Sequence, residues 1–532
     1  MSNESAIRRE VGTLALMFTG LGSIIGSGWL FGAWRAAQLA GPGAIYAWIV
    51  GAVVILFVAL TYAELGAMFP ESGGAARYGH YSHGALVGFI AGWAAWIAIV
   101  SVIPVEAEAS VQYMSSWPWD WAQALYVHAS DGQGELTFPG LLISAALVII
   151  YFLLNFWSVK VFASTNSAIT FFKLIVPAAT AIALMHREFH WENFHVGVHG
   201  GQHVGNLASI LTAVATSGIV FSYNGFQSPV NLAGEARTPG RSVPIAIFGS
   251  ILLSTVVYLM LQIAFLGAVA PEHLQDGWAA LEYSSPFAQL ALALNLNWLA
   301  LLLYADAFVS PSGTGTTYTA TTARMIYAME RSATIPRLFG RVHPRFGIPR
   351  PAMWFNLVVS FMFLFFFRGW GKLAAVISVA TIITYLVVPI SVMVLRRTAP
   401  HLHRPLRVPG LGILAPIAFV MATLMLYWAR WPHTAQIMLL LILPLPFYLY
   451  YQGRSGWQDF ARNLRGAWWL AGYLLAMCAL SWAGSTEFEG RGYIGYGWDQ
   501  LCVAVAALGF YFWGLRSGWS TPAVQAVESQ VR

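Results

Sequence analysis

Long apolar runs separated by short polar stretches follow one another along almost the whole chain. A transmembrane helix needs roughly 20 apolar residues, and fourteen runs approach or exceed that length. The longest runs predict helices that are tilted, broken or extended into water. The pattern therefore predicts an all-α integral membrane protein with about 14 transmembrane helices. The runs lie near residues 12–39, 43–68, 85–115, 139–157, 165–186, 205–233, 243–270, 286–328, 352–367, 373–395, 410–431, 433–451, 466–484 and 498–515.

Two of these runs are interrupted by residues that weaken a helix. Residues 20–32 read GLGSIIGSGWLFG, and each glycine costs roughly 0.5–1 kcal/mol relative to alanine in a helix interior. The sixth run contains SYNGFQSP at 222–229, in which the proline lacks a backbone donor and Asn-Gly readily leaves helical geometry. Close helix packing through Gly22-x-x-x-Gly26 would explain the first interruption alone. Two interruptions in corresponding places instead favour broken helices at spans one and six.

The order of the runs suggests an internal symmetry. Runs one to five cover about 12–186, and runs six to ten cover about 205–395. Because five is odd, the second block starts on the opposite side of the membrane, which is the signature of an inverted repeat. We predict a transport core over 1–397 and an accessory module of about four helices over 398–532.

Composition and charge agree with a membrane protein and orient it. Only 9% of the residues are charged, compared with about 25% in soluble domains. If the N-terminus is cytoplasmic, 21 of the 28 lysines and arginines fall in cytoplasmic segments and five fall outside. Positive residues concentrate on the cytoplasmic side of plasma-membrane proteins. We therefore expect a plasma-membrane protein with both termini in the cytoplasm, and we interpret the net charge of +6 as a result of topology rather than of nucleic-acid binding.

Broken helices offer a specific chemistry. The N-terminus of a half-helix carries roughly half a positive charge and free N–H donors, which suit a carboxylate. Carbonyl groups at the opposite half-helix end suit an ammonium group. A zwitterionic α-amino acid needs both.

Lys173 lies about eight residues inside the fifth run. A lysine within a membrane is a candidate functional residue, because it can gain and lose a proton there. A lysine whose amine snorkels to the interface is the alternative, and the depth of Lys173 argues against it.

Three further acidic residues lie within spans. Glu106, Glu108 and Asp306 could each carry a proton, contact the substrate or pair with a buried cation. Glu106 and Glu108 point to different helix faces, and we favour Glu106 for the central cavity. Asp306 precedes a polar run, 310–315, that we expect to weaken its helix, and a buried hydrogen-bond anchor is its alternative role.

Arg35 lies two turns beyond the first interruption. It could bind an acidic side chain of the substrate or form an ion pair with an acidic outside loop. The histidine-containing loop 186–203 lacks tight ligand spacing, so we expect no metal site. No nucleotide-binding motif is present, so we expect no cofactor and transport that is passive or driven by a gradient.

Several local motifs resemble one transporter family. GSIIGSG at 22–28, YAELG at 62–66 with PESGGAARY at 70–78, and AGEARTPGRSVPIA at 233–246 are similar to motifs of the amino acid–polyamine–organocation (APC) family. Within it, the chain most resembles bacterial aspartate–proton symporters, through residues 26–31, 81–84 and 155–160 and the fourteen-span length. The likeness covers most of the chain.

The resemblance implies a LeuT-type bundle of five plus five helices in inverted repeats, with substrate between spans one, three, six, eight and ten. In several proton-coupled relatives a lysine in span five occupies the place of a sodium ion, and Lys173 matches that lysine, which implies a role in proton coupling. Arg35, Glu108 and Val111 depart from the aspartate carriers. The substrate-binding residues that the resemblance implies are Ile24, Ile25, Gly26, Ser27, Gly28, Phe221, Ser222, Tyr223, Asn224 and Gly225.

We therefore expect a secondary active transporter, not an enzyme, that imports an amino acid by proton symport, with aspartate and glutamate as candidate substrates. An amino-acid exchanger or a polyamine carrier of the same fold is the alternative. A membrane sensor or enzyme is more remote, because no cluster of metal ligands or nucleophiles gathers at one depth. The expected partners are the amino acid, the proton and the lipid bilayer.

Overall fold

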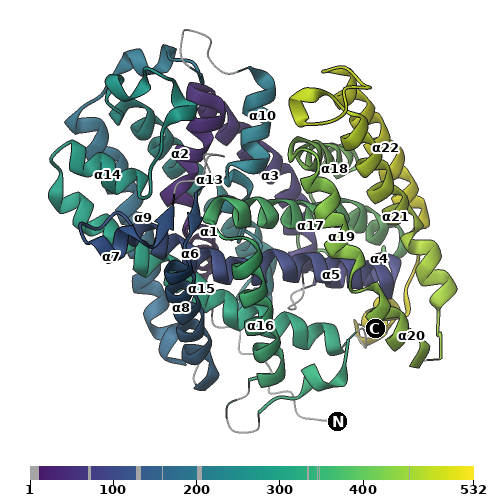
Figure 1. Cartoon of the computed structure of the whole chain (residues 1–532). Coiled ribbons are helices and arrows are strands. Elements are labelled where there is room, and N and C mark those ends of the chain that lie inside the picture. Colours follow the sequence, from purple (N-terminus) through teal and green to yellow (C-terminus); the bar gives the residue numbers. More distant parts are fainter. Residues whose placement is uncertain are drawn as a thin grey trace.

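The computed structural model is almost entirely helical (Figure 1). It describes residues 11–69, 74–127, 134–157, 160–199, 206–331, 335–343, 346, 348–454 and 456–531. Residues 70–73 and 158–159, which belong to two of the family-like motifs, fall outside these ranges. The longer helices are α1 (Thr13–Ile24), α2 (Gly28–Ala40), α3 (Ala44–Met68), α4 (Gly74–His83), α5 (Ala85–Val100), α6 (Val102–Met114), α8 (Phe138–Trp157), α9 (Lys160–Arg187), α10 (Leu207–Thr216), α13 (Pro239–Ala268), α14 (Pro286–Ala293), α15 (Asn297–Arg331), α16 (Arg350–Phe366), α17 (Trp370–Thr398), α18 (Leu411–Trp428), α19 (His433–Ile442), α20 (Leu445–Arg454), α21 (Phe460–Ala483), α22 (Trp498–Ser517) and α23 (Pro522–Val531).

Helices occupy all fourteen predicted runs, but fewer pass as spans by length and composition. In the described part of the chain, ten helical stretches are long and apolar enough to cross a membrane, or eleven if one bent pair counts as a span. One of the ten, Gly28–Met68, contains the second half of span one and all of span two. The helices α1 and α16 are short, and α15 is rich in serine and threonine, so these contribute no further spans by that test.

Two predicted runs divide differently from expectation. The run 286–328 contains two helices, α14 and α15, and the run 433–451 contains α19 and α20. The expected weakness at 310–315 was wrong, because α15 continues through it. Hydroxyl groups there donate to carbonyls one turn earlier, as Thr314 does to Ser310 and Thr317 does to Gly313. These bonds satisfy the polar side chains without opening the helix.

The bundle is built around α17, which is buried along most of its length. Helices α3, α4, α5, α6 and α18 pack against it, while α1 packs between α13 and α9. The helices α18 to α22, coloured green to yellow, gather on one flank of the molecule (Figure 1). Of these, α18 contacts both α17 and α3, so the flank is joined directly to the central helices.

The corner between α4 and α5 is closed by α22 and by the segment that connects it to α23. His83 is fully buried there, and one of its ring nitrogens lies 2.9 Å from the carbonyl oxygen of Gly514. Trp519 donates to the His83 carbonyl, and Thr521 donates to the Tyr81 carbonyl. Burial lowers the pKa of His83 to about 4, so its imidazole is neutral at physiological pH.

Candidate functional site

Span one is broken as predicted. Helix α1 ends at Ile24, Ile25 is extended with φ −84° and ψ 92°, and α2 begins at Gly28. The three residues between the two helices lie at the centre of the glycine-rich stretch. The break leaves the Ser27 amide at the start of α2, where it can donate to a group outside the helix.

Span six is broken at two points. Gly218 adopts a left-handed conformation between α10 and α11 (Ile219–Tyr223), and the chain bends there by 49°. Asn224 is extended and Gly225 has φ +117°, a value that favours glycine, before α12 (Ser228–Asn231) begins. The predicted interruption at 222–229 is therefore confirmed.

The two breaks pack directly against each other. A Cβ atom added to Gly225 would lie 2.7 Å from the Ser23 carbonyl carbon, and one added to Gly28 would collide with the Ser222 side chain. The Tyr258 hydroxyl lies within 3.2 Å of the Ile24 carbonyl oxygen and 3.0 Å of the Ser222 carbonyl oxygen. Carbonyl groups of both breaks thus converge on one point.

The structure brings Glu106 and Lys173 to the first break. The Ser27 amide donates to Glu106 Oε2 at 2.9 Å, and a Cβ atom on Gly26 would lie 2.5 Å from Glu106 Oε1. Lys173 donates to the Gly22 carbonyl at 3.1 Å and to Thr314 Oγ1 at 2.5 Å. Both side chains are buried. A carboxyl group and an amine therefore bond backbone groups beside the break, the Ser27 N–H and the Gly22 carbonyl.

The other candidates lie farther from the backbone of the breaks. Asp306 accepts a hydrogen bond from Ser310 within α15 and interacts electrostatically with Lys173. Arg35 donates to Gln38 at 2.7 Å, and its guanidinium lies over the Trp34 ring. Glu108 faces the start of α17 rather than the break, as expected for a residue two positions from Glu106.

Three aromatic residues at the site were not singled out from the sequence. Tyr258 and Tyr318 donate to carbonyls of span one, and Trp370 donates to Ser27 Oγ at 2.9 Å. The Trp370 ring also contacts Phe31 and Phe221, one from each broken span. Aromatic residues are common in this chain, and a tyrosine in an apolar span carries no signal that marks it for a site. Trp370 closes the breaks on the side where α17 begins.

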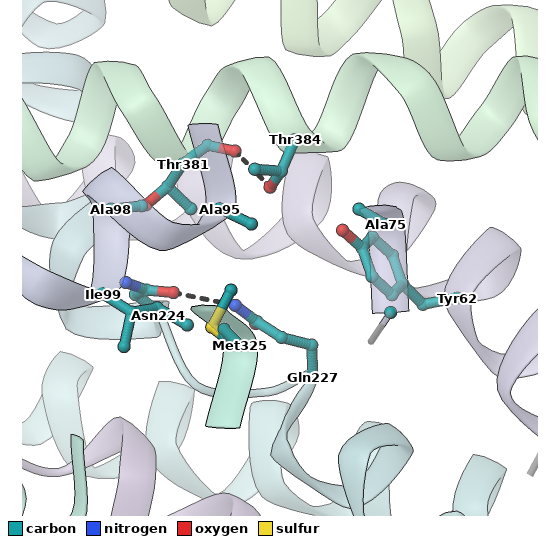
Figure 2. A pocket seen from close by; sticks show the side chains of 11 residues that line it. Tyr62, Ala75, Ala95, Ala98, Ile99, Asn224, Gln227, Met325, Thr381 and Thr384 are labelled. Atoms are coloured by element: carbon teal, nitrogen blue, oxygen red, sulfur yellow. Dashed lines mark hydrogen bonds between the residues drawn. The ribbon is translucent and has the colours of Figure 1, made fainter. Parts of the chain in front are cut away.

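A narrow cavity lies between the span-six break and α4, and Asn224, Gln227 and Ala75 are among the residues that line it (Figure 2). It measures about 40 Å³, which admits a few water molecules but not an amino acid. Gln227 donates to Asn224 Oδ1 at its edge, as Figure 2 shows. The Asn224 side-chain nitrogen and the Thr381 hydroxyl are buried there without a hydrogen-bond partner. Its remaining lining residues include Tyr62, Ala95, Ala98, Ile99, Met325 and Thr384.

Two broken helices that meet around buried charges, within a bundle of membrane-length helices, define a LeuT-type solute transporter. The family model described as amino acid permease matches residues 11–447. The chain therefore belongs to the amino acid permease family, a family of multi-pass membrane transporters and not of enzymes.

Named relatives extend along nearly the whole chain. It is 58% identical to the glutamate/serine transporter AimA of Bacillus subtilis, over 97% of this chain and 95% of that protein. It is 36% identical to the aspartate-proton symporter of the same organism, over 98% of this chain and 99% of that protein. Similarity to the B. subtilis branched-chain amino acid permease BcaP is lower, at 25% identity over 85% of this chain.

Proposed function

We propose that this permease imports an acidic amino acid across the bacterial plasma membrane together with a proton. The observation that carries the proposal is the meeting of the two breaks beside Glu106 and Lys173. There the Ser27 amide is held by a carboxylate, and a lysine binds the first half-helix. A transported zwitterion needs such an amide for its carboxylate and the carbonyls around Ser222 for its ammonium group.

The relatives support the substrate class. The two with the highest identities quoted above are a glutamate/serine transporter and an aspartate-proton symporter, so an acidic amino acid is the chemistry common to both names. We propose that residues 24–28 and 221–225 hold the α-carboxylate and α-ammonium groups, and that Lys173 takes part in proton coupling. Serine, which also appears in the name of the first relative, is the neutral substrate with which the acidic amino acids are compared.

The remaining expectations are part of the same proposal. Residues 1–397 form the transport core, with inverted repeats over about 12–186 and 205–395, and residues 398–532 form an accessory module. Both termini face the cytoplasm. The cavity toward α4 then lies on the cytoplasmic side and marks the exit route, while Trp370 closes the outer side.

Uptake into proteoliposomes tests the proposal. The purified full-length chain is reconstituted, and uptake of labelled glutamate, aspartate and serine is measured with an inward proton gradient and without one. We expect accumulation of an acidic amino acid that collapses when a protonophore is added. Gradient-independent equilibration would contradict proton coupling, and uptake that requires a preloaded amino acid would identify an exchanger instead.

A further inference from the structure

The amide that the substrate carboxylate would need is already bonded to a carboxylate of the protein. Glu106 Oε2 accepts from the Ser27 N–H at 2.9 Å. Its other oxygen, Oε1, has no hydrogen-bond partner, although the side chain is fully buried. Glu106 therefore occupies the anion-binding position at the start of α2 with half of its hydrogen-bonding capacity unused.

The carbonyl groups of the breaks are bonded by tyrosine hydroxyls, which hold the two breaks together. The Tyr258 hydroxyl lies at hydrogen-bond distance from the carbonyls of Ile24 and Ser222, one from each break. The Tyr318 hydroxyl donates to the carbonyl of Ser23. Side chains of the protein thus already bond an N–H group and carbonyl groups of the breaks.

From this arrangement we infer that Glu106 is an internal competitor of the substrate α-carboxylate, and that its protonation frees the Ser27 amide for the substrate. The inference rests on the proposed function and assigns the coupled proton to a carboxyl oxygen of Glu106. An ionised carboxylate is a stronger acceptor from an N–H than a neutral carboxylic acid. Substrate binding at Ser27 and protonation of Glu106 therefore favour each other.

The charges at the site balance for one proton per substrate. Before binding, the Lys173 ammonium and the Glu106 carboxylate compensate each other. A proton from the outer solution then bonds to a Glu106 oxygen, and the zwitterion brings its own carboxylate to the Ser27 amide. No other covalent bond changes, and the proton leaves Glu106 again after the substrate departs.

Polar and titratable groups of four other helices surround Glu106 and its lysine partner. A Cβ atom on Gly26 would lie 2.5 Å from Glu106 Oε1 and 3.1 Å from Thr314 Oγ1, so both oxygens flank this glycine. Lys173 donates to the same threonine. The titratable groups that face Glu106 or its lysine partner are Lys173 on α9, Tyr151 on α8, Tyr258 on α13, and Tyr318 and Asp306 on α15.

The experiment compares Glu106→Gln with wild type in glutamate, aspartate and serine binding from pH 5.5 to 8.5. Glutamine keeps an oxygen for the Ser27 amide but cannot be ionised. In wild type, affinity should fall as pH rises and approach tenfold per unit, the limit for one proton taken up with the substrate. Glu106→Gln should bind with little pH dependence and at least about tenfold more tightly than wild type at pH 8.5.

Glu108→Gln is the matched control, because Glu108 lies two residues away and faces α17. It should retain the wild-type pH slope. Weaker binding by Glu106→Gln at every pH, or an unchanged slope, would overturn the inference and leave Glu106 as a direct partner of the substrate ammonium group.

Proton uptake gives a second readout that does not depend on a variant folding. Adding substrate to the wild-type protein in weakly buffered detergent solution should remove close to one proton per bound substrate at pH 7.5–8.5. Substrate binding without proton uptake would overturn the role of Glu106. If the wild-type protein bound none of the three amino acids, the proposed function itself would fail.

Discussion

The two helix breaks differ in what they present. The break in span one offers an N–H group, from Ser27, and meets a carboxylate and a lysine. The break in span six offers a carbonyl, from Ser222. Other polar groups of this break bond one another, since Gln227 accepts from the Gly225 amide and donates to Asn224. The two breaks are therefore complementary. The N–H group of span one suits a negative charge, and the carbonyl group of span six suits a positive charge.

A side chain at the contact between the breaks should have the largest effect. Gly28→Val would drive the two breaks apart, because its Cβ meets Ser222. Overpacking typically costs about 1–3 kcal/mol, so affinity for the substrate should fall about 5- to 150-fold. Isothermal titration with the purified variant measures the loss.

Gly509→Val on α22 is the matched control, because no atom lies within 4 Å of its added Cβ. It should bind as wild type does. Normal binding by Gly28→Val would show that the glycines serve helix packing rather than the site.

Removing the cation of the first break should have the next largest effect. Lys173→Ala loses the bonds to Gly22 and Thr314 and the charge that faces Glu106. We expect proton-driven accumulation to be lost and the pH dependence of exchange to flatten, measured as counterflow in proteoliposomes. Lys372→Ala removes a lysine paired with Glu135, at the start of α17, and should retain both properties. Unchanged pH dependence in Lys173→Ala would refute its coupling role.

A moderate effect is expected at the tyrosine that joins the breaks. Tyr258→Phe removes a hydroxyl bonded to Ile24 and Ser222 and leaves the ring in place. A hydrogen bond contributes about 0.5–1.5 kcal/mol net, so transport should slow about 2- to 10-fold. Tyr46→Phe, an exposed tyrosine on α3, serves as its control. An uptake rate equal to wild type would mean that the two carbonyls need no shared donor.

The smallest effect on transport is expected far from both breaks, at His83. Burial lowers its pKa to about 4, so below pH 6.5 the unfolded chain binds a proton that the folded state excludes. Stability should therefore decrease as pH falls from about 6.5 toward 4, by up to about 3 kcal/mol from this group. Thermal unfolding monitored across that range should show a shallower decline for His83→Asn, with near-normal transport at pH 7.

The sequence was sufficient for the parts of the site that depend on backbone chemistry. Glycine, proline and Asn-Gly mark the breaks because few other residues tolerate those conformations, and Lys173 stands out because a charge in a membrane is expensive. Tyr258 and Trp370 could not be predicted, because their roles depend on which helices become neighbours. The continuity of α15 through Pro311 was missed for a similar reason. Hydroxyl groups that favour a break in isolation can bond back to their own helix.

The closed corner at α4 has a consequence for how the protein is made. The carbonyls of Tyr81 and His83 accept hydrogen bonds from Thr521 and Trp519, and the His83 ring contacts the Gly514 carbonyl. A ribosome completes those partners more than 400 residues later. Until residues 514–521 have been made, the corner at α4 lacks these hydrogen-bond partners. A chain truncated before α22 should therefore be less stable than the full chain, because these hydrogen bonds cannot form.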